Sequence, residues 1–380
     1  MPAAPASTRF PHHATDRDSA MRVVHIVAHK GINGVTTSCR TLISAQQRHG
    51  HEIMLVTMPG GWLTKQDFPK PLEIIESHLK TRPREIARVG YLIRDWNPTV
   101  IHCHASKANK YGLVYRVVAG SPVLTTAHAR KRQLPFAFLR AVIAPSTQTA
   151  QFHRRNNLVP AAKIAVIPHP ISDVISSGTA RAKCREELGL SEDEFVIGMV
   201  GAVDKRKNQI DGLRILEKVL SRHPHARLVV VGNRGGEGTM PGWAELLARP
   251  SVRDSVILTG HRDDAVSLIE SFDTLLSTSR IEEGPIVVLE AMALERPIVS
   301  YAVGMVPDIV RDGTDGFVLS VDDVCGAAER ICQLIEDPDL RERIGKQGRL
   351  RLLQECGERK IIEQIDAAYE RVARAAGTWK

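Results

Sequence analysis

Short apolar runs alternate with amphipathic segments along most of the chain. Parallel strands need a crossover that is usually a helix, so this alternation predicts parallel βαβ units and an α/β fold class. Helices are predicted at 36–48, 108–119, 210–222 and 289–294, and over the end of the chain from residue 323. The predicted strands are 21–29, 51–58, 99–105, 121–129, 141–146, 163–170, 195–203, 226–233, 255–261, 274–279, 296–303 and 316–320.

A chain of 380 residues is expected to form two domains. The alternating pattern is interrupted at 168–172, where two prolines fall, and restarts at 195. We therefore expect two doubly wound domains, 21–168 and 169–359, with a cleft between them that suits a large ligand. Residues 1–20 lack an apolar core, and we expect a disordered leader there, which makes Met21 a candidate native start.

The composition is that of a globular protein, with 43% hydrophobic and 25% charged residues. No apolar run is long enough to span a membrane, and no secretory signal is visible. The cysteines are scattered, without zinc spacing, and a chain of this size does not need disulfides. We therefore expect a reducing, cytoplasmic setting. The six cysteines are Cys39, Cys103, Cys184, Cys325, Cys332 and Cys356.

The net charge of +8 is concentrated in one part of the chain. Between Trp96 and Ser172 there is no aspartate or glutamate. Such a stretch is either a solvated basic face or a surface that meets an anionic partner. A nucleic-acid-binding protein is a poor fit, because aromatic residues are only 4% of the chain and no stacking platform is evident. The basic residues of this stretch are Lys107, Lys110, Arg116, Arg130, Lys131, Arg132, Arg140, Arg154, Arg155 and Lys163.

Two loops that follow predicted strands have features of anion sites. Gly31 and Gly34, in KGINGV, allow a ligand close to the backbone at the start of a helix, although a plain tight turn fits as well. In GAVDKRKNQ, the cationic turn at 205–207 suits a diphosphate, because lysine offers a point charge and arginine a fork. A solvent-facing turn is the alternative there.

The segment IEEGPIVVLEAM, residues 281–292, brings carboxylates to both ends of an apolar run. Glu282 lies in the loop after a predicted strand, and Pro285 suits the first turn of the helix that contains Glu290. A carboxylate can accept hydrogen bonds from two adjacent sugar hydroxyls. Two such groups could therefore hold a nucleotide ribose and the sugar that the nucleotide carries.

The spacing from Glu282 to Glu290 resembles the donor-site signature of the retaining GT-B glycosyltransferases of family 4, and the likeness extends over nearly the whole chain from Met21. TVIHCHASKANKYGLV is similar to the family's H-x-H-[ST]-x-[KR]-A segment, which places His104 and Lys107 in the first domain. VLTTAHA places His128 where the family carries a histidine in the cleft. KIAVIPHPIS resembles the link between the family's domains.

The resemblance implies that the second domain binds a nucleotide sugar and the first domain an acceptor. It implies that Glu290 holds the ribose and Glu282 the transferred sugar, and that cations stabilise the departing diphosphate. It further implies front-face displacement with retention and no metal ion or cofactor. The expected catalytic residues are Glu282, His128, Arg206 and Lys207, although His128 could be an ordinary polar residue at a strand end. The expected donor-binding residues are Gly31, Gly34, Gly201, Arg206, Lys207, His261, Arg262, Glu282, Glu283, Gly284, Pro285, Ile286 and Glu290.

Three departures from the family pattern concern the sugar site. Gly201-Ala202-Val203 stands where G-R-L is usual, so Arg206 has to replace the family's phosphate-binding arginine. Glu283-Gly284 stands where glycine followed by phenylalanine or leucine is common, and residues 305–308 replace the usual G-[GS]-x-x-E. The family's C-terminal helix, here about 360–380, is expected to pack back on the first domain.

The acceptor is expected to be an anionic or lipid-linked saccharide of the cell envelope. His104, Lys107, Arg130, Lys131 and Arg132 are the candidate acceptor-binding residues, and the basic stretch would also hold the protein at an anionic membrane surface. A nucleotide-sugar epimerase of the same fold is the rival interpretation, since it shares the two domains but needs no acceptor.

Overall fold

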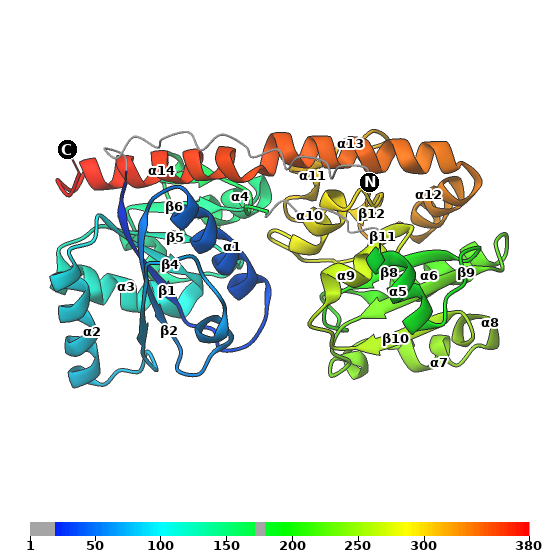
Figure 1. Cartoon of the computed structure of the whole chain (residues 1–380), viewed down its shortest axis with the longest axis horizontal. Coiled ribbons are helices and arrows are strands. Elements are labelled where there is room, and N and C mark those ends of the chain that lie inside the picture. The colour runs from blue at the N-terminus through cyan, green and yellow to red at the C-terminus, as the bar shows by residue number, and fades with distance from the viewer. Residues whose placement is uncertain (1–19, 172–178, 380) are drawn as a thin grey trace, which may run out of the picture.

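The computed structural model of the chain describes residues 20–171 and 179–379. Two α/β domains lie side by side, and two long C-terminal helices run along one side of both (Figure 1). Except for Ala20, the leader predicted at 1–20 lies outside the described residues. Within those residues, no helix is both long and apolar enough to cross a membrane.

The first domain is built on a seven-stranded, fully parallel sheet with the strand order β3-β2-β1-β4-β5-β6-β7. The order reverses between β1 and β4, as in a doubly wound sheet. The strands are β1 (Arg22–Val27), β2 (Glu52–Thr57), β3 (Leu72–Glu76), β4 (Val100–His104), β5 (Val123–Thr126), β6 (Ala141–Ala144) and β7 (Ile164–Val166). The helices are α1 (Gly34–Arg48), α2 (Pro83–Trp96), α3 (Ala105–Ala119) and α4 (Thr147–Asn156), with short 3₁₀ turns η2 (Trp62–Lys65), η3 (Leu134–Phe138) and η4 (Ala161–Lys163).

The second domain repeats the plan with a six-stranded parallel sheet in the order β10-β9-β8-β11-β12-β13. The predicted fold class of two doubly wound α/β domains is therefore confirmed. The strands are β8 (Phe195–Val200), β9 (Ala226–Val231), β10 (Val256–Gly260), β11 (Thr274–Ser277), β12 (Ile298–Tyr301) and β13 (Phe317–Leu319). The helical elements are α5 (Thr179–Leu188), α6 (Gln209–Leu220), η5 (Glu237–Thr239), α7 (Trp243–Leu247), α8 (Pro250–Arg253), α9 (Ala265–Glu270), α10 (Ile286–Ala293), α11 (Val306–Ile309), α12 (Val324–Glu336), α13 (Pro338–Cys356) and α14 (Glu358–Arg374).

Each sheet buries both of its faces, as parallel sheets do. In the first domain, one face packs on α1 and α14 and the other on α2 and α3. In the second domain, one face packs on α6 and α12 and the other on α5, α9, α10 and α13. Burial on both faces explains why the strand sequences read as continuous apolar runs.

The two C-terminal helices belong to different domains, although only Gly357 separates them. Leu352 of α13 is buried in the second domain, whereas Ile361, Ile365 and Tyr369 of α14 are buried in the first. Figure 1 shows the crossing, with α13 above the second domain and α14 above the first.

Sequence patterns missed β3 and several helices, among them α2, α5 and α9, and misplaced some helix ends. β3 is an edge strand whose residues are mostly exposed, so it lacks the long apolar run that marks the buried strands. α1 begins at Gly34, two residues earlier than predicted, because the Asn33 side chain accepts hydrogen bonds from the N–H groups of Val35 and Thr36. α10 begins at Ile286, so Pro285 is its N-cap and does not lie in its first turn.

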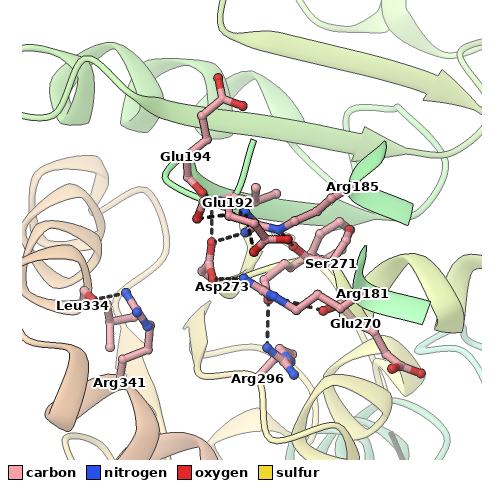
Figure 2. A network of polar contacts seen from close by, with 12 residues as sticks. Arg181, Arg185, Glu192, Glu194, Glu270, Ser271, Asp273, Arg296, Leu334 and Arg341 are labelled. Carbon is pink, nitrogen blue, oxygen red and sulfur yellow. Dashed lines mark hydrogen bonds and ion pairs between the residues drawn. The ribbon is translucent and has the colours of Figure 1, made fainter. Parts of the chain in front are cut away.

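A buried ion pair anchors α5 to the amino ends of two strands in the second domain (Figure 2). Arg185 is 1% exposed, and its Nη2 lies 2.7 Å from Oδ2 of Asp273. Its Nε also donates to the carbonyl of Ser271, at 3.2 Å. Asp273 accepts further hydrogen bonds from Arg181, at 2.8 Å, and from the backbone N–H of Val196, at 2.8 Å. This network therefore stabilises the amino ends of β8 and β11. Ligands of such folds bind at the opposite, carboxyl ends of the strands.

We predict that Arg185→Met lowers the free energy of unfolding by about 3–5 kcal/mol, because removal of one partner leaves a buried carboxylate short of its charge pair. The matched control is Arg222→Met. Arg222 pairs with Glu329 and Glu336 on the exposed surface, and its loss should cost about 1 kcal/mol or less. Urea denaturation of both variants measures the difference, and equal effects would contradict the anchoring role.

Candidate active site

Polar residues gather where the strands of both sheets have their carboxyl ends. In the first domain these are His104, the last residue of β4, and His128, two residues after β5. In the second domain they are the turn at 204–208, after β8, and the loop at 278–285, after β11. Ligands of doubly wound folds bind at these ends.

The turn at 204–208 is rigidly tied to the loop after β11. Oδ1 of Asp204 accepts hydrogen bonds from the backbone N–H groups of Arg206 and Lys207, both at 2.9 Å. Asn208 has a left-handed backbone, and its side-chain amide donates to the carbonyl of Thr278, at 3.2 Å. The Thr278 hydroxyl donates in return to the carbonyl of Asn208, at 2.8 Å. The hydrogen bonds of Asp204, Asn208 and Thr278 therefore fix the backbone from which the Arg206 and Lys207 side chains extend.

Two cations converge on one buried carboxylate. Oε1 of Glu282 lies 2.6 Å from Nζ of Lys207 and 3.1 Å from Nη1 of Arg206. The Glu282 side chain is 8% exposed and that of Lys207 15%. Gly201 makes room for this arrangement, because it has a φ of +141° and a Cβ there would lie 3.0 Å from Cε of Lys207. Two positive groups on one carboxylate leave an excess positive charge that can hold an anion.

The next residues of the loop contact the first domain. Oε1 of Glu283 accepts a hydrogen bond from the backbone N–H of Arg130, at 3.1 Å, and burial raises the pKa of Glu283. Gly284 lies against the interdomain link, where a Cβ would come within 2.8 Å of Cδ2 of His169. The His169 ring stacks on that of His128, with centroids 5.3 Å apart and planes 9° apart. The structure therefore brings the 282–284 loop and His128 to one site between the domains.

Glu290 lies in the second turn of α10. Burial raises the pKa of its carboxyl to about 7. A carboxyl with this pKa is ready to ionise near neutral pH and to accept hydrogen bonds from a ligand that replaces the missing solvation.

His128 is the outer member of a network of buried histidines. Its Nε2 lies 3.2 Å from Nδ1 of His104, and Nε2 of His104 lies 2.9 Å from Nδ1 of His25. Nδ1 of His102 lies 2.7 Å from the hydroxyl of Tyr369, which comes from α14. His104 and His128 also line a small pocket beside the link at 167–170.

The same cluster holds two groups of side chains with ligand atoms within 4.8 Å of one another: His25, His102 and His104, and Cys39 with His104 and His128. Hydrogen bonds engage every ring nitrogen of the first group. These bonds account for its geometry as a polar network within the core.

The other expected site residues make contacts of their own, outside the cluster of Lys207, Arg206 and Glu282. Gly31 and Gly34 belong to the exposed start of α1, where the carbonyl of Gly31 accepts a hydrogen bond from Thr36. His261 is exposed at the end of β10, and Arg262 is paired with Glu187 and Asp264. Among the expected acceptor residues, Nζ of Lys107 donates to the carbonyl of His78, at 3.3 Å, and Arg132 donates to the side-chain oxygen of Asn156, at 3.2 Å. Lys131 has an exposed side chain.

Sequence reasoning missed several residues that shape the site. His25 is a lone polar residue inside an apolar strand, and that contrast could have identified it. Gln46, Tyr369 and Asp211 carry no comparable local signal. Asp211 is buried and accepts hydrogen bonds from Asn208, at 2.7 Å, and from Tyr301, at 3.1 Å, and so supports the cationic turn.

Two family models match the chain, one in each domain. The model described as "Glycosyltransferase Family 4" matches residues 32–173, and "Glycosyl transferases group 1" matches residues 180–351. The second match contains the cationic turn, the 278–285 loop and Glu290, and the first contains His104 and His128.

Curated relatives match at modest identity. The N-acetyl-alpha-D-glucosaminyl L-malate synthase of Bacillus anthracis is 27% identical over 190 residues, which are 50% of this chain and 49% of the relative. The capsular polysaccharide biosynthesis glycosyltransferase CapM of Staphylococcus aureus is 29% identical over 180 residues, 47% of each chain. The chain thus spans about half the length of these relatives.

A solved structure, Anabaena Alr3699/HepE in complex with UDP and glucose, has the same fold with a TM-score of 0.79. The match covers 91% of this chain and 98% of that chain, at 18% sequence identity. The two family models together cover the residues that form the site, and the solved structure has the same two-domain architecture. The chain therefore belongs to the group 1 and family 4 glycosyltransferases, and its two domains have the GT-B fold.

Proposed function

We propose that the protein transfers a sugar from a nucleotide sugar to a saccharide or lipid-linked acceptor, with retention of the anomeric configuration. The observation that carries the proposal is the meeting of Lys207, Arg206 and Glu282 between the carboxyl ends of β8 and β11. The solved structure with UDP and glucose shows that a protein of this fold takes such a ligand.

The cationic turn fits the leaving diphosphate. Negative charge grows on that group as the bond to the anomeric carbon breaks, and fixed cations stabilise the growing charge. Lys207 and Arg206 already share one carboxylate, so a diphosphate would compete with Glu282 for them. Release of Glu282 would free its oxygens to accept hydrogen bonds from the transferred sugar, while Glu290 accepts hydrogen bonds from the ribose.

A front-face displacement is the mechanism we propose. Retention through a covalent intermediate needs two carboxyl groups about 5 Å apart across the reacting bond. Here Glu282 is paired with two cations and Glu283 with the backbone of Arg130. Neither carboxylate is therefore placed as an unpaired nucleophile, and the acceptor hydroxyl would attack from the side of the departing diphosphate.

The acceptor side has a surface that combines basic and apolar residues. In η3, Leu134 is 77% exposed and Phe138 is 59% exposed. Arg116 of α3 donates to the carbonyl of Phe138, at 3.2 Å, so α3 and η3 lie against each other. Exposed apolar residues beside the acid-free basic stretch fit an anionic lipid surface, where rings and aliphatic chains enter the interface and cations meet headgroups. This surface supports our proposal of a lipid-linked acceptor of the cell envelope.

We predict that Lys207→Ala lowers kcat by roughly 10²–10³-fold with a smaller change in KM, because its charge acts mainly in the transition state. Arg206→Ala should act in the same direction. Lys218→Ala, which removes an exposed lysine from the end of α6, is the control and should keep normal kinetics. The assay follows consumption of UDP- and GDP-sugars with a saccharide acceptor. Conversion of the donor into another nucleotide sugar would instead favour an epimerase.

A second prediction concerns the raised pKa of Glu290. Nucleotide affinity of the native protein, measured by calorimetry with UDP and GDP, should increase as pH rises from about 6 to 8, because the ionised carboxylate is the stronger acceptor and can accept from two ribose hydroxyls at once. Glu290→Gln should bind weakly without this pH dependence. The folded-state pKa lies above the unfolded value, so the stability cost of ionisation is absent below about pH 4.5 and grows as pH rises through about 7.

The same substitution should therefore stabilise the unliganded protein at pH 8, by up to about 3 kcal/mol, and have little effect at pH 5. Urea denaturation at both pH values measures this difference. Glu329→Gln, which alters an exposed pair with Arg222, should show no such contrast. A gain of equal size at both pH values would rule out ionisation as its cause.

The third prediction concerns the membrane. The protein should float with anionic liposomes at low salt and lose this binding at high salt, because exposed charges are screened within about 8 Å at physiological ionic strength. Replacement of Lys131 and Arg132 together by serine should reduce binding without changing nucleotide affinity, whereas adding Arg130→Ser would also remove the partner of Glu283 in the donor loop. The control replaces Arg249 and Arg253, two exposed arginines of the second domain, by serine. Equal binding to neutral liposomes would argue for a soluble acceptor.

A further inference from the structure

An unbroken line of hydrogen bonds runs from the C-terminal helix to the site between the domains. Nε2 of Gln46 lies 3.0 Å from the hydroxyl oxygen of Tyr369, and Oε1 of Gln46 lies 2.7 Å from Nε2 of His25. From Nδ1 of His25 the line continues to Nε2 of His104, at 2.9 Å, and from Nδ1 of His104 to Nε2 of His128, at 3.2 Å. The line thus passes through residues of α14, α1, β1 and β4 and ends at His128, two residues after β5.

The three rings in this line are neutral at physiological pH. Burial lowers the pKa of His25 to about 4 and holds those of His104 and His128 well below their usual range. A neutral imidazole has one N–H donor and one lone pair. Each ring that uses both nitrogens must therefore donate at one and accept at the other, and the direction of one bond fixes the direction of the next.

The amide of Gln46 sets that direction. Its NH₂ group donates to Tyr369, so its oxygen must accept from Nε2–H of His25. His25 then accepts at Nδ1 from Nε2–H of His104.

His104 in turn accepts at Nδ1 from Nε2–H of His128, and Nδ1 of His128 is left as a lone pair. Because the Tyr369 hydroxyl accepts from Gln46, its own proton is available to Nδ1 of His102, which lies 2.7 Å from the hydroxyl oxygen. Nε2–H of His102 then donates to the hydroxyl of Thr126, at 2.8 Å, so the branch is satisfied as well.

We propose that Tyr369 is a positioning residue of the active site, which acts through this line to hold His128 as the Nε2–H tautomer. The lone pair at Nδ1 then accepts a hydrogen bond from a hydroxyl of the bound sugar or acceptor, whereas the opposite tautomer would present a donor there. The assignment of a sugar as the ligand rests on the proposed function. The tautomer itself does not.

The first test is the ¹⁵N spectrum of the full chain labelled at histidine, with His128→Gln to assign the His128 signals. The expected result is a protonated Nε2 and an unprotonated Nδ1 on His128, since the two kinds of nitrogen resonate far apart. A protonated Nδ1 on His128 would mean that Gln46 has the reverse amide orientation and that every bond runs the other way. That spectrum would overturn the proposal.

The second test is Tyr369→Phe, which keeps the buried ring and removes only the hydroxyl. Gln46 then loses the acceptor that fixes its amide, so the His128 signals should shift towards a mixture of tautomers. Turnover of the nucleotide sugar should fall roughly tenfold with KM for the donor unchanged, as expected when one hydrogen bond at the reacting sugar is lost. Tyr91→Phe is the matched control, because Tyr91 is exposed on α2 and lies outside the line.

The two readouts separate the two possible failures. If no nucleotide sugar reacts but Tyr369→Phe shifts the His128 signals, the proposed function fails and the positioning line stands. If Tyr369→Phe lowers turnover or stability while the His128 signals stay unchanged, the tyrosine is merely structural and the proposal is overturned.

Discussion

The burial of one carboxylate organises the site between the two domains. An ionised carboxylate that is almost fully removed from water needs charged partners and hydrogen bonds. Glu282 obtains them from Lys207 and Arg206, which start from a turn held by Asp204 and by Asn208. The loop that carries Glu282 also contacts Arg130 of the first domain and His169 of the interdomain link. The loop that carries this ion-pair cluster thus contributes both to the charge of the site and to the contact between the domains, which also meet where Thr147 and Gln148 contact residues 302–308.

Much of the fold could be predicted from the sequence, because a parallel strand buried on both faces is a continuous apolar run and its helices supply a regular alternation. Some elements were not predicted; β3, for example, does not bury such a run. Lys207 and Glu282 could be identified because each follows a strand, and the carboxyl ends of parallel strands share an edge. The ion pair between Lys207 and Glu282 could not be predicted, because it depends on how the Lys207 side chain packs against the backbone of Gly201.

The histidine network shows a second kind of contact that could not be predicted from the sequence. His102 and Tyr369 are 267 positions apart in the chain and 2.7 Å apart at their polar atoms. No local pattern records such a contact. Only the lone polar residue inside a buried strand, as at His25, indicates that a partner must exist, and the identity of that partner is a property of the packed domain.

The crossing of the chain at Gly357 has a consequence for how the protein folds during synthesis. The core of the first domain includes Ile361, Ile365 and Tyr369, which a ribosome adds about two hundred residues after β7, at roughly 5–20 residues per second. Until α14 arrives, the face of the first sheet beside α1 lacks part of its cover, and α13 completes the core of the second domain only just before. The first domain therefore cannot complete its core before nearly the whole chain has been made, although N-terminal domains generally fold first.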